Sequence, residues 1–174
     1  MIEFALIRDT RIPSRGTSKS SGIDLFCPKM DDAFIKTFNS RNNHARSMAY
    51  YDDSHHNIFV YPHGQVMIPT GLLVNFLEQE DSTLIALNRG SISWEPRLTL
   101  LACNIDQDFE GELFISMQNY SDLATIILPE QKLTQVVRVP VFYDDIQIVD
   151  KNTIFKIITE RGTGMMGSTD RDNK

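Results

Sequence analysis

Several features are scarce or missing in this chain of 174 residues, and each absence excludes a class of protein. Only two cysteines occur, Cys27 and Cys103, and they form no CxxC pair. We therefore expect free thiols in a reducing cytoplasm, with no disulfide framework. No apolar run approaches the roughly 18–20 residues that a membrane-spanning helix needs. The start, MIEFALIRDTRIPSRG, places charge inside its short apolar stretch and has no small-residue cleavage site, so we expect no secretory signal.

Positive charge is also in deficit. Lys and Arg number 17 against 23 Asp and Glu, which gives a net charge of −6. Broad binding to nucleic acid requires a basic face, so no direct nucleic-acid binding is expected. A highly charged anion would have to be held by local arginines, backbone N–H groups and a divalent cation, against an unfavourable overall field.

The sequence does contain the material of a β-rich core. Apolar residues make up 41% of the chain, and Gly and Pro are present in ordinary numbers. Short apolar runs separated by turn signals, without sustained helical periodicity, predict an all-β sandwich or jelly roll. The expected strands are 4–8, 23–26, 65–76, 82–87, 98–103, 124–128, 133–143 and 154–159.

The most informative stretch is CNIDQDFEGELFISMQN, at 103–119. Its pattern predicts a strand ending at Cys103, an acidic turn over 106–111 and a second strand over 112–119. We expect Gly111 to supply the conformational freedom of the turn. A hairpin of this kind holds carboxylates on a stiff support, as a general base or a cation-binding acid requires. Taken alone, such a turn is more often solvated and without chemistry.

Five short motifs together resemble the trimeric deoxyuridine triphosphatases (dUTPases). IDQDFEGE at 105–112 resembles their third motif, Ile-Asp-x-Asp-Tyr-x-Gly-Glu. The other four occur in the family's order as SGIDLF (21–26), NRGSIS (88–93), LPEQKLTQVV (128–137) and RGTGMMGSTD (161–170). The resemblance implies a distorted jelly-roll β domain over 1–160. It also implies a flexible arm, 161–174, that closes a neighbouring active site in a homotrimer.

The same resemblance implies a reaction, in which water attacks the α-phosphorus of dUTP and releases dUMP and pyrophosphate. Asp106 matches the family's general base. Phe109 stands where the family has a Tyr against the deoxyribose, and a flat ring there would still exclude a 2′-hydroxyl. The positions matching the uracil and sugar pocket are Asn104, Ile105 and Phe114.

Further matches concern the triphosphate. Asp24 matches an aspartate that holds Mg²⁺ through water, a mode that suits a cation reluctant to shed its water shell. In the second motif Arg89 is kept, whereas Gly90 and Ser91 invert the usual Ser-Gly order. The family's serine contacts the phosphates, and Gly90 at its position lacks the hydroxyl. Gln135 keeps the phosphate-binding amide of the fourth motif.

The final motif implies that the arm contacts the nucleotide. Arg161 matches an arginine that meets the γ-phosphate, and Gly167 and Ser168 follow the family pattern. Met166 replaces the Phe that stacks on uracil. Its polarizable sulfur can lie on a base, more loosely than a ring, so we expect weaker closure and a higher KM.

Residues 27–63 depart from the family, whose connection here is about half as long or shorter. We interpret roughly 20 of these residues as an insertion, since long loops in compact domains are usually functional or mobile. Its apolar residues suggest a protein partner as a hypothesis. His55 and His56 beside Asp52 and Asp53 lack a recognisable metal-ligand spacing and indicate a solvated loop.

Two alternatives remain open. A dCTP deaminase shares the fold and would need a glutamate base, for which Glu110 or Glu112 is available, although the arm favours a dUTPase. A non-catalytic or weakly active regulatory homologue, binding a protein partner, is suggested by Met166 and the altered second motif. The main prediction is a cytoplasmic, Mg²⁺-dependent dUTP diphosphatase.

Overall fold

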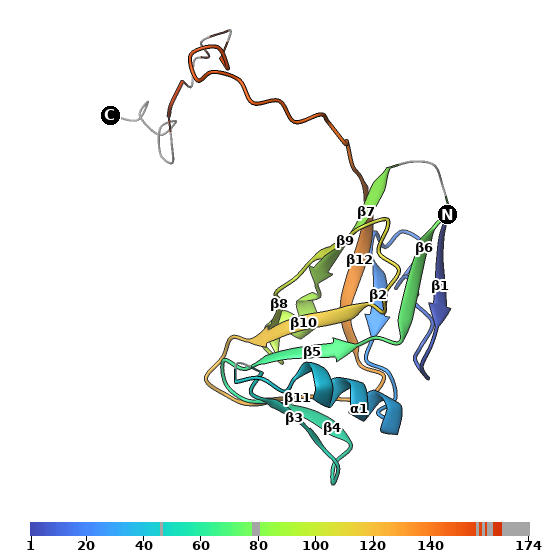
Figure 1. Ribbon diagram of the computed structural model, residues 1–174. Coiled ribbons are helices and arrows are strands. Elements are labelled where there is room, and N and C mark those ends of the chain that lie inside the picture. Colours follow the sequence, from blue (N-terminus) through green and yellow to red (C-terminus); the bar gives the residue numbers. More distant parts are fainter. Residues whose placement is uncertain (46, 78–80, 156, 158, 160–161, 165–174) are drawn as a thin grey trace. The chain divides into compact units, whose positions relative to one another are not determined.

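A computed structural model describes residues 1–45, 47–77, 81–155, 157, 159 and 162–164. By its internal contacts the chain divides into two compact units, Met1–Phe142 and Tyr143–Lys174. Strands account for most of the regular structure of the first unit (Figure 1), which confirms the all-β prediction. No helix in the described ranges is long and apolar enough to cross a membrane.

The described strands form four antiparallel sheets. The smallest pairs β1 (Ile2–Leu6) with β6 (Leu72–Phe76). Two three-stranded sheets have the orders β5 (Gln65–Pro69), β10 (Phe114–Asn119), β8 (Leu98–Leu100) and β11 (Thr125–Ile127), β4 (Asn57–Val60), β3 (Ala49–Asp52). The largest has the order β2 (Ile23–Phe26), β12 (Lys132–Pro140), β7 (Ser82–Asn88), β9 (Asn104–Ile105).

Alternation along the strands builds the core. In β10, Ile115 and Met117 are buried whereas Phe114 and Ser116 are only partly so, as the period of two in a half-buried strand requires. In the largest sheet, Leu84 and Val136 are fully buried on one face. The opposite face carries the partly exposed and polar residues, and the candidate site lies there.

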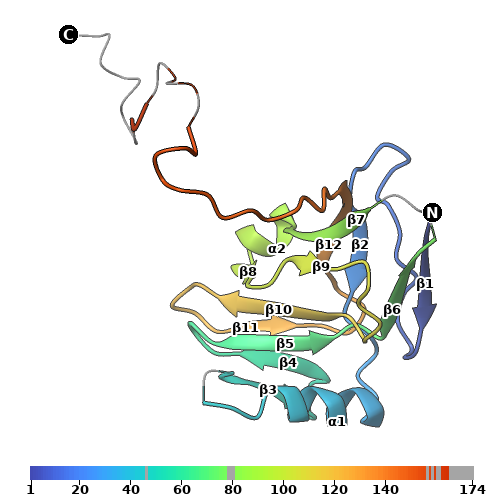
Figure 2. The ribbon, with the colours of Figure 1, turned by 45° about the horizontal axis from the view of Figure 1, so that its top comes forward.

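The 27–63 segment, interpreted from the sequence as containing an insertion, has regular structure. Helix α1 spans Asp32–Arg41 and packs against β5 and β3. In Figure 2 it lies next to the β3 and β4 strands. Asp31 caps it, accepting a hydrogen bond from Phe34 N at 2.8 Å. Phe34 and Phe38, one helical turn apart, are fully buried, so the helix belongs to the core of the first unit. A second helix, α2, spans Gly90–Trp94.

The expected strand at 154–159 is wrong for its described residues. Residues 154 and 157 lie in bends, and residues 155 and 159 have no regular structure. All four of these residues are exposed, so burial does not stabilise a strand there. Both cysteines are free as expected, Cys27 buried and Cys103 exposed. Burial raises the pKa of the Cys27 thiol.

Candidate active site

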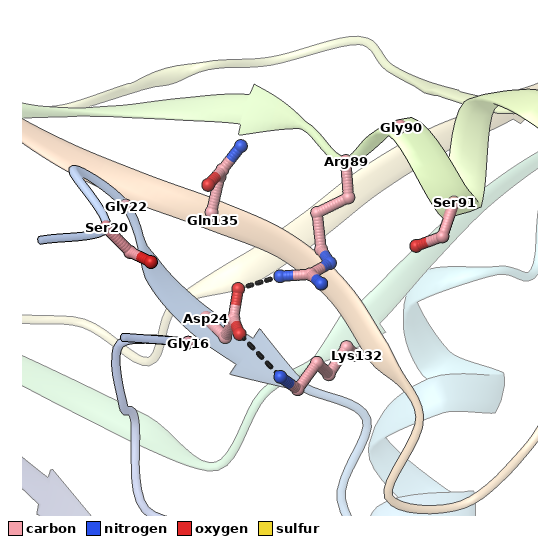
Figure 3. A pocket seen from close by; sticks show the side chains of 9 residues that line it. All are labelled: Gly16, Ser20, Gly22, Asp24, Arg89, Gly90, Ser91, Lys132 and Gln135. Carbon is pink, nitrogen blue, oxygen red and sulfur yellow. Dashed lines mark hydrogen bonds and ion pairs between the residues drawn. The ribbon is translucent and has the colours of Figure 1, made fainter. Parts of the chain in front are cut away.

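Three of the five motifs meet in one pocket of about 400 Å³ (Figure 3). We call it the cationic pocket. Its lining residues come from the loop before β2, from β2 itself, from the β7–α2 junction and from β12: Gly16, Ser20, Gly22, Asp24, Arg89, Gly90, Ser91, Lys132 and Gln135. Every residue expected to bind phosphate or Mg²⁺ outside the arm therefore lies in this pocket.

Asp24 is the central acid of the cationic pocket, and it is only 3% exposed. One carboxylate oxygen pairs with the Arg89 guanidinium, and the other lies 2.8 Å from Lys132 Nζ. A buried carboxylate is tolerated when it is paired in this way. With two cations facing one carboxylate, the pocket retains a net positive charge that suits an oxyanion.

Arg89 ends β7 and precedes α2. Within the described residues no group accepts a hydrogen bond from its buried Nε. A buried donor without a partner costs free energy, which an incoming oxyanion could offset by drawing the guanidinium toward it.

Lys132 was not among the predicted site residues. A bulge between Lys132 and Thr134 shifts the register of β12 against β2. The extra residue places Lys132 on the same side as Gln135, whereas strict alternation would put them on opposite faces. The signal in the sequence was a cation within the fourth motif, three residues before Gln135.

Gln135 is held close to Gly22. A Cβ atom at Gly22 would lie 2.2 Å from Gln135 Oε1 and 2.8 Å from its Cβ, so no larger residue fits. The side-chain amide of Gln135 donates to Asn88 O at 3.3 Å. The pairing of Asp24 with Gln135 across β2 and β12 brings both side chains to one face.

A second pocket, of about 250 Å³, lies beside the acidic turn. We call it the hairpin pocket. It contains all five residues predicted in and beside the third motif, together with apolar and polar neighbours: Met67, Ala102, Asn104, Ile105, Asp106, Phe109, Glu112, Leu113, Phe114 and Ser116. Met67 was missed because it lies on β5, outside every motif.

Asp106 is exposed at the mouth of this pocket, where it can reach water. The Asn104 amide donates to its carboxylate, and Asn104 Oδ1 in turn accepts from Thr83 Oγ1 at 2.8 Å. This chain fixes the orientation of the amide and hence of the carboxylate. Such support is what a positioned general base requires.

The role expected for Gly111 is wrong. Its φ lies outside the left-handed region that favours glycine. The Phe109 ring instead packs directly over it, and a Cβ atom at this position would lie 2.6 Å from Phe109 Cζ. The glycine provides room for the ring, which remains 44% exposed toward the pocket.

Glu112 is already engaged. Its two carboxylate oxygens accept from Arg8 Nε and Nη2 at 2.9 and 3.1 Å, and one also accepts from Gly71 N at 2.9 Å. The hydrogen bond to Glu112 raises the pKa of Arg8. A carboxylate bound in this bidentate manner is poorly suited to abstract protons, which argues against Glu112 as the base of the deaminase alternative.

The two pockets share no lining residue. Asp24 on β2 and Asn104 on β9 are separated by β12 and β7 in one sheet. Three steps of about 4.8 Å place them roughly 14 Å apart. The remaining predicted residues, Arg161, Met166, Gly167 and Ser168, lie outside the described residues.

The structure is thus that of an all-β protein with an anion-suited pocket and a separate pocket, lined by apolar and polar residues, beside an acidic turn. No family model matches the chain. The deoxyuridine 5′-triphosphate nucleotidohydrolase of Methylobacillus flagellatus is 30% identical over 162 residues, covering 92% of this chain and 88% of that protein. The same enzyme of Ralstonia nicotianae is 36% identical over 107 residues, covering 60% and 69%. The chain belongs to the dUTPase family.

Solved structures agree on the fold. The dUTPase of Staphylococcus bacteriophage 80alpha, as a point mutant with dUpNHpp, superimposes with a TM-score of 0.71 at 17% identity, covering 97% of this chain and 98% of that one. Native EIAV dUTPase gives a TM-score of 0.60 at 16% identity, covering 88% and 100%. The predicted jelly-roll architecture is confirmed.

Proposed function

We propose that the protein hydrolyses dUTP to dUMP and pyrophosphate. The observation that carries the proposal is the convergence of the first, second and fourth motifs on one cationic pocket, with the third motif forming a pocket of its own. Family membership supplies the substrate class, and the relatives with this name act on deoxyuridine 5′-triphosphate.

Asp106 is the proposed base. It takes a proton from a water whose oxygen attacks the α-phosphorus, while the bond from that phosphorus to the bridging oxygen breaks and pyrophosphate leaves. Arg89, Lys132 and the Gln135 amide bind the phosphate oxygens and offset the charge that develops on them. Gly90 and Ser91 complete the wall around the phosphates.

The hairpin pocket is proposed to bind the nucleoside. Phe109 covers the deoxyribose and leaves no room for a 2′-hydroxyl. Ile105 and Phe114 contribute apolar surface, and Asn104 lies where the base and sugar meet. Small, mostly apolar pockets with a few placed polar groups are typical of such recognition.

We propose Mg²⁺ as the cofactor. The described residues hold no group of three or more His, Cys, Asp or Glu side chains suited to a metal. Asp24, whose oxygens already face two cations, fits only an outer-sphere role through water, with Mg²⁺ arriving on the triphosphate. When bound, Mg²⁺ neutralises phosphate charge. One neighbour, a mutant dUTPase from phage phi11 of S. aureus, is described with a structural Mg(II) ion.

We propose a homotrimer with shared sites. Asp24 of the cationic pocket and Asn104, two residues before the base, are three strand spacings, roughly 14 Å, apart in one chain. The reaction needs the base and the cations at one α-phosphorus. Between them the outer face of the sheet carries partly exposed apolar side chains, Ile85, Leu87, Val137 and Val139, suited to contact another copy. The arm, with Arg161, Met166, Gly167 and Ser168, would close over the nucleotide bound by a neighbouring subunit. The proposed location of the enzyme is inside the cell.

The decisive measurement is pyrophosphate release with Mg²⁺ from dUTP, dTTP, dCTP and UTP, using Asp106→Asn as the control. We expect rapid release from dUTP only, reduced at least about a hundredfold by the substitution, because general-base catalysis contributes that much. Unchanged activity in Asp106→Asn would overturn the assignment of the base. Binding of dUTP without hydrolysis would favour the regulatory alternative.

A second proposal concerns a protein partner. On the outer face of the β11–β4–β3 sheet, Ile126, Phe59 and Tyr50 lie directly opposite one another. Ile126 is 46% exposed and Tyr50 42%, and Tyr61 at the end of this stripe is 45% exposed. We propose that a partner protein covers it. The test compares the binding of a purified partner to the wild type and to the double variant Tyr50→Ser/Tyr61→Ser, with dUTP hydrolysis intact in both proteins. Binding to the wild type alone would support the proposal. Equal binding to the two proteins would refute it.

A further inference from the structure

The 27–63 segment reaches the hairpin pocket through side chains, although it contributes no residue to its lining. Helix α1 is fixed to the core by Phe34 and Phe38, both fully buried, with ring centroids 5.9 Å apart. Its C-terminal end and the residues that follow lie against β5. Groups at this end are therefore held by a rigid support.

Asn42 makes the closest connection. Its amide nitrogen donates to Met67 O at 2.9 Å and to Phe38 O at 2.8 Å. Its amide oxygen accepts from Met67 N at 2.9 Å and from Ser47 Oγ at 3.0 Å. The side chain is 9% exposed and uses both of its polar functions on the backbone around it.

The side-chain amide of Asn42 pairs with the backbone of β5 as a neighbouring strand would. β5 is an edge strand, paired only with β10 in its sheet. Both backbone groups of Met67 point away from β10 and would otherwise be unpaired. The Asn42 amide presents a donor and an acceptor side by side, as a neighbouring backbone would. It thereby fixes the position of Met67, whose side chain lines the hairpin pocket.

Two further contacts reach other lining residues. The Arg41 guanidinium carbon lies 5.0 Å from the centroid of the Phe114 ring. Arg8, which holds Glu112, also donates from Nη2 to Thr37 Oγ1 of α1 at 2.8 Å. Met67, Phe114 and Glu112 are thus each connected to α1 or to the residue after it.

We infer that the 27–63 segment shapes the nucleoside side of the site, with Asn42 and Arg41 as positioning residues that act through Met67 and Phe114. The inference rests on the proposed function, because it assigns the hairpin pocket to the nucleoside. It gives the segment a role within the enzyme, separate from any partner bound to the β11–β4–β3 face.

The test measures binding of the nucleoside half and of the phosphate half of the substrate separately. Inhibition constants of dUMP and of pyrophosphate are measured against dUTP hydrolysis for the wild type, Arg41→Ala and Asn42→Ala, with calorimetric binding of dUMP alongside. Lys36→Ala is the matched control, since it removes the same charge from an exposed position on α1.

We expect Arg41→Ala to weaken dUMP binding about two- to fivefold, the effect of losing an exposed cation–π contact. Asn42→Ala should weaken it about tenfold, because two backbone groups lose their partner. The inhibition constant of pyrophosphate should stay within about twofold of the wild-type value in all variants. A twofold difference is roughly the precision of such constants. Lys36→Ala should leave both ligands unchanged.

Equal weakening of dUMP and pyrophosphate would indicate general loosening and overturn the inference, as would unchanged dUMP binding in both variants. If Asn42→Ala does not fold, Arg41→Ala decides alone. A wild type that neither hydrolyses dUTP nor binds dUMP would overturn the proposed function and the inference together. A wild type that binds dUMP no better than its variants would overturn only the inference.

Discussion

At the scale of single residues, Asp24 shows how a predicted site residue can have a second task. The resemblance assigns it to the water shell of Mg²⁺, and the structure shows its carboxylate between Arg89 and Lys132. Because a buried carboxylate is costly unless paired, these two cations are held in place by the acid they neutralise. Asp24 therefore organises the cationic pocket before any ligand arrives.

Gly22 provides the sharpest prediction at this scale. A methyl group there would overlap Gln135, whose own Cβ would be only 2.8 Å away and cannot be displaced by a rotamer change. We expect Gly22→Ala to weaken pyrophosphate binding about three- to tenfold, the value of one lost hydrogen bond. Inhibition of dUTP hydrolysis by pyrophosphate measures this.

A double variant shows whether the effect passes through Gln135. In Gln135→Gly both the amide and the Cβ that the methyl group would meet are gone, so adding Gly22→Ala should cost little more. Fully additive losses would instead mean that the methyl group acts elsewhere, for instance on the pairing of β2 with β12.

At the scale of elements, the 27–63 segment differs most from expectation. Its helix was missed because only Phe34, Phe38 and a partly buried Ile35 form the apolar face, too short a signal in a polar stretch. The capping aspartate, Asp31, is a recognisable start signal, though such residues are common in loops. Tertiary packing on β5 stabilises what local propensity leaves marginal.

The cap offers a test of how much this helix contributes. Asp31→Ala removes the hydrogen bond to Phe34 N and should lower the free energy of unfolding by about 1 kcal/mol. Asp31→Asn removes only the charge and should retain most of the stability, since asparagine caps equally well. Urea unfolding of the three proteins measures the differences; equal losses in both variants would point to the charge.

At the scale of the whole molecule, the register of one sheet sets the architecture of the site. β2 and β9 lie at opposite edges of the β2–β12–β7–β9 order, so the acid that holds the cations and the proposed base belong to different ends of one surface. The proposed homotrimer would bring the two together from different copies of the chain. The partly exposed apolar face between the two edges is suited to that contact.

Mixing two inactive variants tests shared sites. Asp106→Asn and Arg89→Ala should each be inactive alone. If each site combines the base of one chain with the cationic pocket of another, an equal co-expressed mixture should regain about a quarter of wild-type activity, by random assembly of a symmetric oligomer. Sites confined to one chain would regain none, and sedimentation of the same samples reports the number of copies.

The sequence by itself determined the β-rich class, the order of the motifs and those pocket residues that belong to the motif matches, because alternation and short motifs are local properties of the chain. It could not predict which motifs share a pocket, since strand order and register depend on pairings between distant residues. The bulge that brings Lys132 beside Gln135, the room that Gly111 gives Phe109 and the attachment of α1 to Met67 were decided only by the tertiary structure. Each is a contact between side chains or strands that local periodicity does not encode.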